Sequence, residues 1–222
     1  MIRLHEHPAS ANCLKVRMLL AQLGLPCERV TVDIFAGESQ TPEYLTRNPA
    51  GRTPLLETDE GAFIPESGAI LLYLAEGSPL LPSDRLERAR VHAWMFFEQN
   101  LFEPNVGTAR FWRLTGREAE QPEAFARHLE AGRAALETLE RGLAEAAFLV
   151  GGCYTVADCA LYGYAHVAHE AGYDMAAYPA VRAWLTRVAE LPGAAADLEP
   201  YPAAAHAGAG GRSVHDLPRD AA

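Results

Sequence analysis

The 222-residue chain lacks most of the features that mark secreted, metal-binding or membrane proteins. Its four cysteines are scattered and form no Cys-x-x-Cys pair, so the sequence predicts neither a disulfide framework nor a zinc site, and no metal is expected. No apolar run approaches the length of a membrane span, and no basic segment precedes an apolar stretch near the first residue. We therefore expect a cytoplasmic protein with reduced thiols and no membrane partner.

Positive charge is also scarce. The chain has 19 Lys and Arg against 29 Asp and Glu, a formal net charge of −10, and no basic cluster with interleaved aromatic residues offsets this balance. Such a surface repels a polyanion, so nucleic-acid binding is not expected. The 49% of hydrophobic residues is sufficient for a substantial core.

Residues 1–77 mix two hydrophobic periods and are predicted to form an α/β domain. Residues 2–5 and 29–34 alternate apolar and polar side chains, as half-buried strands do, and residues 12–23 between them predict a helix that ends at Gly24. The other elements expected are a short helix over 41–47, a hairpin over 55–57 and 62–64, and a helix over 67–75. The predicted order is β-α-β-α-β-β-α.

The rest of the chain has a helical period. A proline-rich stretch without any period predicts a linker over 78–85, followed by an all-α domain over 86–205. Within that domain, Thr155 followed by Asp158 predicts a helix N-cap with a capping box. Residues 206–222 are rich in Gly, Ala and polar side chains and are expected to form a mobile tail.

The start of the first helix is a candidate site. A helix start offers free N–H donors and the positive end of a dipole, so a hydroxyl or an amide there can hold a thiolate or another anion. Ser10 and Asn12 are the candidate donors. The alternative is a purely structural cap, with Asn12 as the capping residue and Ser10 pointing outward.

Two further signals follow along the chain. Thr53-Pro54 opens the third strand, where a proline is tolerated and a cis bond would expose backbone for an extended peptide; an ordinary trans proline is the alternative. Glu66-Ser67 directly precedes a helix, so the hydroxyl and free N–H groups could bind a carboxylate while Glu66 binds an ammonium group. By itself the pair is also a common capping pattern.

The three signals together resemble the N-terminal pattern of bacterial, theta-like, serine-type glutathione transferases. The matching segments are Ser10-x-Asn12-Cys13-x-Lys15-Val16-Arg17, Asn48-Pro49-x-Gly51-Arg52-Thr53-Pro54-x-Leu56, and Glu66-Ser67-x-Ala69-Ile70-x-x-Tyr73-Leu74. The helical half is similar too, through Thr155-x-Ala157-Asp158, and the match spans about residues 1–200. The resemblance implies a thioredoxin-like N-terminal domain followed by a helical bundle, glutathione as co-substrate, a homodimer and a role in detoxification.

The resemblance also implies roles for individual residues. Ser10 would donate a hydrogen bond to the glutathione sulfur, with Asn12 as a second donor. Glu66 and Ser67 would bind the γ-glutamyl head. The remaining glutathione contacts would be the Thr53 backbone for the cysteinyl part, the cis-proline Pro54, and Arg52 with Gln40 near the glycyl carboxylate.

The implied reaction is attack of the glutathione thiolate on a hydrophobic electrophile. Its pocket is expected along the long helix after the linker, with core packing as the alternative for the same residues: Phe102, Asn105, Val106, Arg110, Phe111 and Trp112. Reduction of a disulfide or peroxide by glutathione, and a non-catalytic binding module, are the competing functions. Ser10 stands at the first position of what would be a thioredoxin Cys-x-x-Cys motif, which leaves Cys13 inside the helix, where a buried inert thiol is expected.

Overall fold

A four-stranded mixed sheet forms the centre of the N-terminal half of the computed structural model, which describes residues 1–194 and 197–210. The strands are β1 (Ile2–Glu6), β2 (Cys27–Thr31), β3 (Leu55–Glu57) and β4 (Phe63–Pro65), in the order β2-β1-β3-β4. β1 is parallel to β2 and antiparallel to β3, and β3 is antiparallel to β4. This is the thioredoxin-like arrangement that the sequence predicted.

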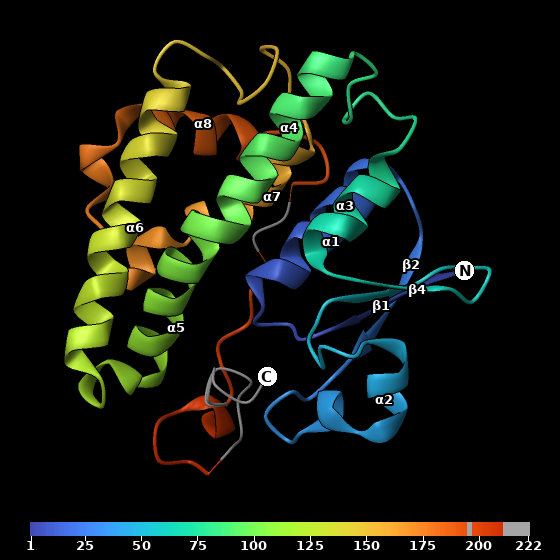
Figure 1. The fold of residues 1–222 in the computed structure, drawn as a ribbon, viewed down its shortest axis with the longest axis vertical. Helices are drawn as coiled ribbons and strands as arrows, with labels where there is room; N and C mark the ends of the chain where they lie inside the picture. The colour runs from blue at the N-terminus through green and yellow to red at the C-terminus, as the bar shows by residue number, and fades with distance from the viewer. Residues whose placement is uncertain (195–196, 211–222) are drawn as a thin grey trace.

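Helices cover both faces of the sheet (Figure 1). They are α1 (Ala11–Gln22), α2 (Pro42–Arg47) and α3 (Ser67–Ala75). α1 and α3 enclose a small core with the sheet, made of Leu4, Val16, Leu20, Leu56 and Ile70. On the other face, α2 contributes Tyr44 to a separate cluster with Val32 and Leu55. Packing against one face of the sheet holds α1 and α3 in fixed positions relative to the strand ends.

The second strand differs from its predicted bounds. It pairs with β1 from Cys27 to Thr31, not over 29–34. Because β1 ends at Glu6, residues beyond Val32 have no neighbouring strand to extend the ladder. Asp33 then turns the chain, since its carboxylate accepts from the backbone N–H groups of Phe35 and Ala36. The apolar alternation therefore continued past the last residue that could pair.

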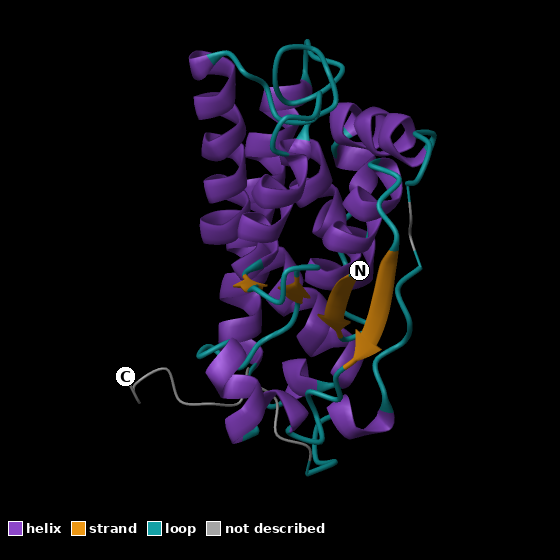
Figure 2. Ribbon diagram, turned by 90° about the vertical axis from the view of Figure 1, so that its right-hand side faces the viewer, coloured by secondary structure: helices purple, strands orange, loops and turns teal. Residues whose placement is uncertain are grey.

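The C-terminal half is a helical bundle beside the sheet, as Figure 2 shows. A long rod begins with α4 (Arg85–Phe97), continues through the π-helical segment η2 (Glu98–Gly107) and ends with α5 (Thr108–Thr115). The other helices are α6 (Pro122–Leu143), α7 (Val156–Ala165) and α8 (Pro179–Ala189), with short 3₁₀ turns between some of them. No helix in the described part of the chain is both long and apolar enough to cross a membrane.

Helix α7 lies at the centre of this half, and all ten of its residues are buried. The predicted capping box is present: Thr155 caps the helix and the Asp158 carboxylate accepts from the Thr155 backbone N–H at 2.9 Å. Asp158 also accepts from the indole Nε1–H of the fully buried Trp184 at 2.9 Å. One buried carboxylate thereby joins α7 to α8.

The segment after α8 returns to the N-terminal half. Arg17 donates to the Asp197 carboxylate at 3.1 Å, and the Glu199 backbone N–H donates to the Pro8 carbonyl at 3.4 Å. Figure 1 shows this orange-to-red segment passing along the junction of the two halves. Of the tail expected over 206–222, Ala207 is bound through its N–H to the Thr115 carbonyl at 2.9 Å, and residues 211–222 lie outside the described residues.

Candidate functional site

Two adjoining cavities open where the start of α1 faces the helical half. We name the first the polar cavity; it is lined by Asn12, Asn48, Arg52, Thr53, Pro54, Glu66, Ser67, Gln99 and Glu103. We name the second the aromatic cavity; it is lined by His7, Ser10, Asn12, Ile34, Phe35, Gly51, Arg52, Thr53, Glu103, Phe111, Tyr164 and Tyr201. The two cavities share Asn12, Arg52, Thr53 and Glu103, so they lie on either side of these residues.

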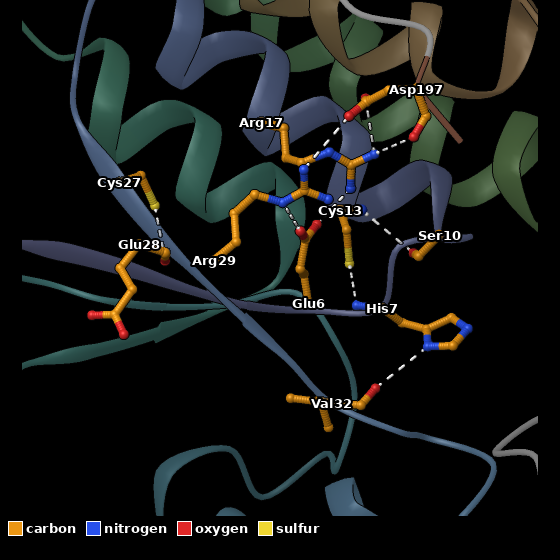
Figure 3. Close-up of polar contacts among 10 residues, drawn as sticks. All are labelled: Glu6, His7, Ser10, Cys13, Arg17, Cys27, Glu28, Arg29, Val32 and Asp197. Carbon is orange, nitrogen blue, oxygen red and sulfur yellow. Dashed lines mark hydrogen bonds and ion pairs between the residues drawn. The ribbon is translucent and has the colours of Figure 1, made fainter. Parts of the chain in front are cut away.

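Ser10 is the N-cap of α1. Its backbone is extended, with φ −83° and ψ 121°, and its Oγ accepts from the Cys13 backbone N–H at 3.4 Å, as Figure 3 shows. The cap is therefore Ser10, and the alternative with Asn12 as cap is wrong, because Asn12 already lies in the first turn. Capping uses only the acceptor side of the hydroxyl, so its hydrogen remains able to donate, and the Cys13 sulfur is one acceptor within its reach. The Ser10 O–H can donate into the aromatic cavity.

Asn12 links the two halves of the molecule. Its Oδ1 accepts from Lys15 Nζ at 2.7 Å and from Ser67 Oγ at 3.2 Å. Its Nδ2 donates to Tyr164 Oη at 3.2 Å and to Glu103 Oε1 at 3.3 Å. Both amide hydrogens are thus used inside the protein, so Asn12 holds other side chains in place and offers no free donor of its own.

A buried ion pair lies directly behind Asn12. Lys15 Nζ is 2.6 Å from Glu98 Oε1, and the two side chains are 1% and 2% exposed. Burial raises the pKa of the Glu98 carboxyl, and the Lys15 cation opposes that shift. Because Lys15 comes from α1 and Glu98 from η2, the pair fixes the distance between the site's two walls.

Glu66 and Ser67 form the far wall of the polar cavity, at the start of α3. Glu66 has φ 68°, the left-handed region, which costs a non-glycine residue free energy and is concentrated at functional sites. Its side chain is exposed, whereas Ser67 is 4% exposed and donates to Asn12 Oδ1. The strained backbone of Glu66 places an exposed carboxylate beside a buried hydroxyl. Such a pair suits the recognition of an amino-acid group that carries both charges.

The loop before β3 completes the polar cavity. The Thr53–Pro54 peptide bond is cis, as the resemblance implied. The Arg52 carbonyl accepts from Tyr44 Oη and from Asn48 Nδ2, each at 2.8 Å, which fixes the loop. In contrast, the exposed Arg52 guanidinium forms no ion pair with any described residue and remains a cation available to a ligand.

Gln40 supports this loop without lining either cavity. Its Nε2 donates to the Gly51 carbonyl at 2.7 Å. A Cβ at residue 51 would lie 2.3 Å from the same nitrogen, so only glycine fits beneath the Gln40 amide, and its φ of 59° also favours glycine. The structure therefore places Gln40 behind the loop that carries Arg52.

Cys13 faces the interior beneath Ser10. It is fully buried, and its sulfur accepts from the His7 backbone N–H at 3.4 Å (Figure 3). Burial raises the pKa of the Cys13 thiol, which keeps it protonated and unreactive. The expected inert thiol is what the geometry shows.

The residues expected along the rod separate into two groups. Phe111 lines the aromatic cavity and stacks on Phe35 with ring centroids 6.4 Å apart. Phe102 and Val106 are 0% exposed and belong to the helical core, so the core alternative holds for them. Only one face of the rod reaches the cavity. Phe102 and Val106 lie one turn apart on another face, which packs into the core.

The three remaining residues of that set also lie outside the cavity lining. Asn105 donates from Nδ2 to the Leu101 carbonyl at 2.7 Å, and the Trp112 ring packs edge-on against His128. Arg110 is 4% exposed and pairs with Glu170 at 2.5 Å. Their polar or aromatic character alone did not reveal which side of the rod each occupies.

Sequence reasoning missed two tyrosines of the aromatic cavity. Tyr164 lies in the apolar sequence of α7, and its position four residues after Ala160 is explained equally well by core packing. Tyr201 comes from the segment after α8, where no periodic pattern indicates which way a side chain points. Among the described residues, no group of three or more His, Cys, Asp or Glu side chains could hold a metal ion.

The chain matches the family models of the glutathione S-transferase N-terminal domain over residues 4–82 and C-terminal domain over residues 122–187. It belongs to the glutathione S-transferase family. The sequence-based recognition and the fold class are thereby confirmed.

Solved structures of bacterial proteins are similar over most of their length. A glutathione S-transferase from Pseudomonas fluorescens is 41% identical, with a TM-score of 0.87 over 89% of this chain and 99% of that chain. A possible glutathione S-transferase from Rhodopseudomonas palustris is 45% identical, with a TM-score of 0.85 over 88% of this chain and 97% of that chain.

A third relative has a regulatory name. The transcriptional regulator URE2 of Saccharomyces cerevisiae is 34% identical over 64% of this chain and 42% of its own length, so the chain spans less than half of that relative. Ure2p in complex with glutathione is 28% identical in the aligned structure, with a TM-score of 0.81 over 87% of this chain and 96% of that chain. Ure2p was also solved with S-hexylglutathione and with S-p-nitrobenzylglutathione.

Proposed function

We propose that this chain is a glutathione transferase that ionises the thiol of bound glutathione and joins the sulfur to a hydrophobic electrophile. The observation that carries the proposal is the position of the Ser10 hydroxyl, which caps a helix start through its oxygen and lines the aromatic cavity. A hydroxyl donor at the positive end of a helix stabilises a thiolate placed beside it.

Glutathione would occupy the polar cavity in an extended conformation. Glu66 would bind the ammonium of the γ-glutamyl head. The carboxylate would bind to the backbone N–H groups at the start of α3 and to the Ser67 hydroxyl, whose hydrogen would turn to it from Asn12 Oδ1, and Thr53 would pair with the cysteinyl backbone. The unpaired Arg52 guanidinium suits the glycyl carboxylate. The complex of Ure2p with glutathione supports this assignment, because that protein shares the fold.

Activation of the thiol is the step for which Ser10 is responsible in this proposal. A free thiol has a pKa of about 8.5, and lowering it by about two units requires ~2.7 kcal/mol of selective stabilisation of the thiolate. A hydrogen bond to a charged acceptor contributes about 1.5–3 kcal/mol, and the dipole of a helix start adds ~0.3–1 kcal/mol. Asn12 would act as a positioning residue, since its amide hydrogens already bind Tyr164 and Glu103.

The aromatic cavity would hold the electrophile. Its apolar walls are formed by Ile34, Phe35 and Phe111 together with two tyrosine rings. Ure2p binds glutathione with a hexyl or a nitrobenzyl group on the sulfur, which shows that this fold accepts apolar groups next to the thiol. An apolar surface beside the sulfur therefore supports transfer to a hydrophobic substrate.

Two assays distinguish this function from its competitors. Calorimetry with glutathione tests for binding, and no binding would contradict both enzymatic functions. Turnover of an aryl chloride with no turnover of a small mixed disulfide supports the transferase; the reverse result supports glutathione-dependent reduction. Binding without turnover of either would favour a binding module, the competitor to which the regulatory name of the URE2 relative points.

We also propose that the protein is cytoplasmic and that its domain boundary lies at the linker 78–85. We further propose that it forms a homodimer through α3 and α4. Large apolar side chains are exposed on α3, α4 and the adjoining η2: Tyr73 is 51%, Phe96 63% and Leu101 54% exposed. Exposed apolar surface of this kind favours association. Light scattering at micromolar concentration is expected to give twice the mass of the chain, and a monomer would contradict the proposal.

A further inference from the structure

The aromatic cavity is lined by two tyrosines, Tyr164 and Tyr201, that come from distant parts of the chain. Tyr164 lies on α7, whereas Tyr201 lies in the segment that follows α8. Both line the same cavity as Ser10, and Tyr201 also lines a neighbouring cavity together with Arg110 and Glu170. What each hydroxyl can do there depends on which side of the oxygen is already occupied.

The oxygen of the Tyr164 hydroxyl already accepts a hydrogen bond from within the protein. Lys15 Nζ has only donor hydrogens, so the Asn12 atom 2.7 Å from it must be the carbonyl oxygen Oδ1. The amide nitrogen of Asn12 consequently faces Tyr164 and donates to its oxygen at 3.2 Å. The hydrogen of Tyr164 is left for another acceptor.

The hydroxyl of Tyr201 is in the same state for an equivalent reason. A guanidinium group has donors and no acceptor, so Arg110 Nη1 donates to the Tyr201 oxygen at 3.1 Å. Arg110 is itself held by Glu170, with Nε 2.5 Å from the carboxylate. Donation from a cation polarises the phenol and makes its remaining hydrogen a stronger donor.

Neither hydrogen has an acceptor among the residues at 1–194 and 197–210. Burial raises the pKa of the phenol of Tyr164 and of that of Tyr201, so both groups keep their hydrogens at neutral pH. Two tyrosine O–H donors without an acceptor in the described part of the chain, on residues that line one cavity, suit a ligand that presents an oxygen acceptor. A halide leaving group or a plain hydrocarbon would leave both hydrogens unpaired.

We propose that the Tyr164 and Tyr201 hydroxyls bind the carbonyl oxygen of the second substrate, and that the preferred substrates are therefore α,β-unsaturated carbonyl compounds. This assignment rests on the proposed transferase function. It makes both tyrosines catalytic residues, because their donors contact the oxygen on which negative charge develops, and it makes Arg110 and Asn12 positioning residues.

The reaction is a conjugate addition and needs no further reactant. The thiolate sulfur attacks the β-carbon and forms the C–S bond, while the electron pair of the C=C bond moves through the α-carbon onto the carbonyl oxygen. Hydrogen bonds from the two phenols stabilise the enolate more than the neutral ketone, because bonds to a charged acceptor are stronger. The α-carbon then takes up one proton, which balances the proton that the thiol released to solvent.

Removing one hydroxyl tests the proposal with two substrates. For Tyr201→Phe we expect kcat/KM with 4-phenyl-3-buten-2-one, an enone, to fall about 10- to 100-fold, the effect of losing a hydrogen bond to a charged acceptor. With benzyl chloride, in which no oxygen gains charge, we expect a change of less than about twofold. Tyr164→Phe should show the same selectivity. An equal loss with both substrates, or no loss with the enone, would overturn the assignment.

Tyr162→Phe is the matched control. Tyr162 lies on α7 two residues before Tyr164, is 4% exposed and stacks on His166 with ring centroids 4.8 Å apart. It is absent from the lining of the aromatic cavity. Removing its hydroxyl should leave both substrates unaffected, and an enone-selective loss in this variant would contradict the role given to Tyr164 and Tyr201.

A binding measurement keeps the oxygen site separate from the transferase function. Calorimetry would compare two glutathione conjugates of equal length, one with a ketone at the third carbon from sulfur and one with a methylene there. We expect the ketone conjugate to bind more tightly and to lose that advantage in Tyr201→Phe. Equal affinities in the unmodified protein would overturn the oxygen site, even if transferase activity is found. If neither substrate is turned over, the transferase function fails, and a ketone preference would still establish the site.

Discussion

Two helices of this protein begin in the same way and serve different purposes. Both α1 and α7 start with a hydroxyl residue at the N-cap, Ser10 and Thr155. At α7 the cap is closed: Thr155 is 1% exposed, and the Asp158 carboxylate, 0% exposed, takes up the nearby donors. At α1 the first turn has no acidic residue, and Ser10 lies partly exposed at a cavity.

The difference shows what separates a structural cap from a binding site. A carboxylate in the first turn neutralises the positive end of the helix and leaves nothing for a ligand. Without it, the same end keeps its charge and its donors, at a cost in stability that a bound anion can offset. A hydroxyl at a helix start therefore indicates an anion site only when the first turn lacks its own acid and the cap faces a cavity.

The largest expected effect is a loss of stability when the cap at the start of α7 is removed. Asp158→Ala removes an acceptor that serves the backbone N–H groups of Leu149 and Thr155, the Thr155 hydroxyl and the Trp184 indole. Buried donors left unpaired cost ~1–3 kcal/mol each, so we expect a loss of about 3 kcal/mol or more in the free energy of unfolding. Urea denaturation measures it. The control is Asp174→Ala, an exposed cap of a short 3₁₀ turn, for which about 1 kcal/mol is expected. Similar losses in the two variants would show that the buried cap of α7 contributes no more to stability than an exposed cap.

The next largest effect is expected on glutathione affinity, at the wall of the polar cavity formed by the start of α3. Glu66→Gln and Ser67→Ala each remove a charged or polar partner of the γ-glutamyl head, and we expect each to weaken binding by ~1.5–3 kcal/mol. Calorimetry gives the affinity directly. The matched control is Glu76→Gln, an exposed carboxylate at the other end of α3. If Glu66→Gln and Ser67→Ala both bind like the unmodified protein, the γ-glutamyl head lies elsewhere.

A smaller effect concerns acid stability beside Ser10. Burial lowers the pKa of His7 from its ordinary value of 6.5, and no described residue pairs with its Nε2. Between that value and the lower folded value the unfolded chain binds more protons, so stability falls as pH drops below about 6.5. His7→Gln should flatten this dependence by at most about 1.4 kcal/mol per pH unit. Denaturation at several pH values measures it, and an unchanged slope would show that His7 does not titrate in this way.

The sequence predicted the fold well because turns and periods are local. Residues 67–75 were predicted as a helix and α3 has those bounds, and the Thr155 capping box was found from two residues. The strand expected over 29–34 was displaced because its end depends on the length of a distant partner, β1. Local patterns fix an element's type, and tertiary pairing fixes where it stops.

The site was only partly predictable, for a related reason. Ser10, Thr53, Glu66 and Ser67 lie within motifs whose order identifies the family, and the structure brings all four to the two adjoining cavities. Which face of the long rod meets the cavity depends on the packing of two domains, so Phe102 and Val106 could not be separated from Phe111 by sequence. Tyr201 reaches the cavity through a segment without periodic structure, and no local pattern marks it.

The central claim is that Ser10 stabilises the thiolate of glutathione, and the pKa of the bound thiol tests it most directly. The ultraviolet absorbance of the thiolate, followed against pH, should show that pKa raised by at least about one unit in Ser10→Ala, equivalent to ~1.4 kcal/mol, with glutathione affinity nearly unchanged. Cys13→Ala, a buried thiol one turn away, should leave the pKa as it is. An unchanged pKa in Ser10→Ala, or a raised one in Cys13→Ala alone, would contradict the account.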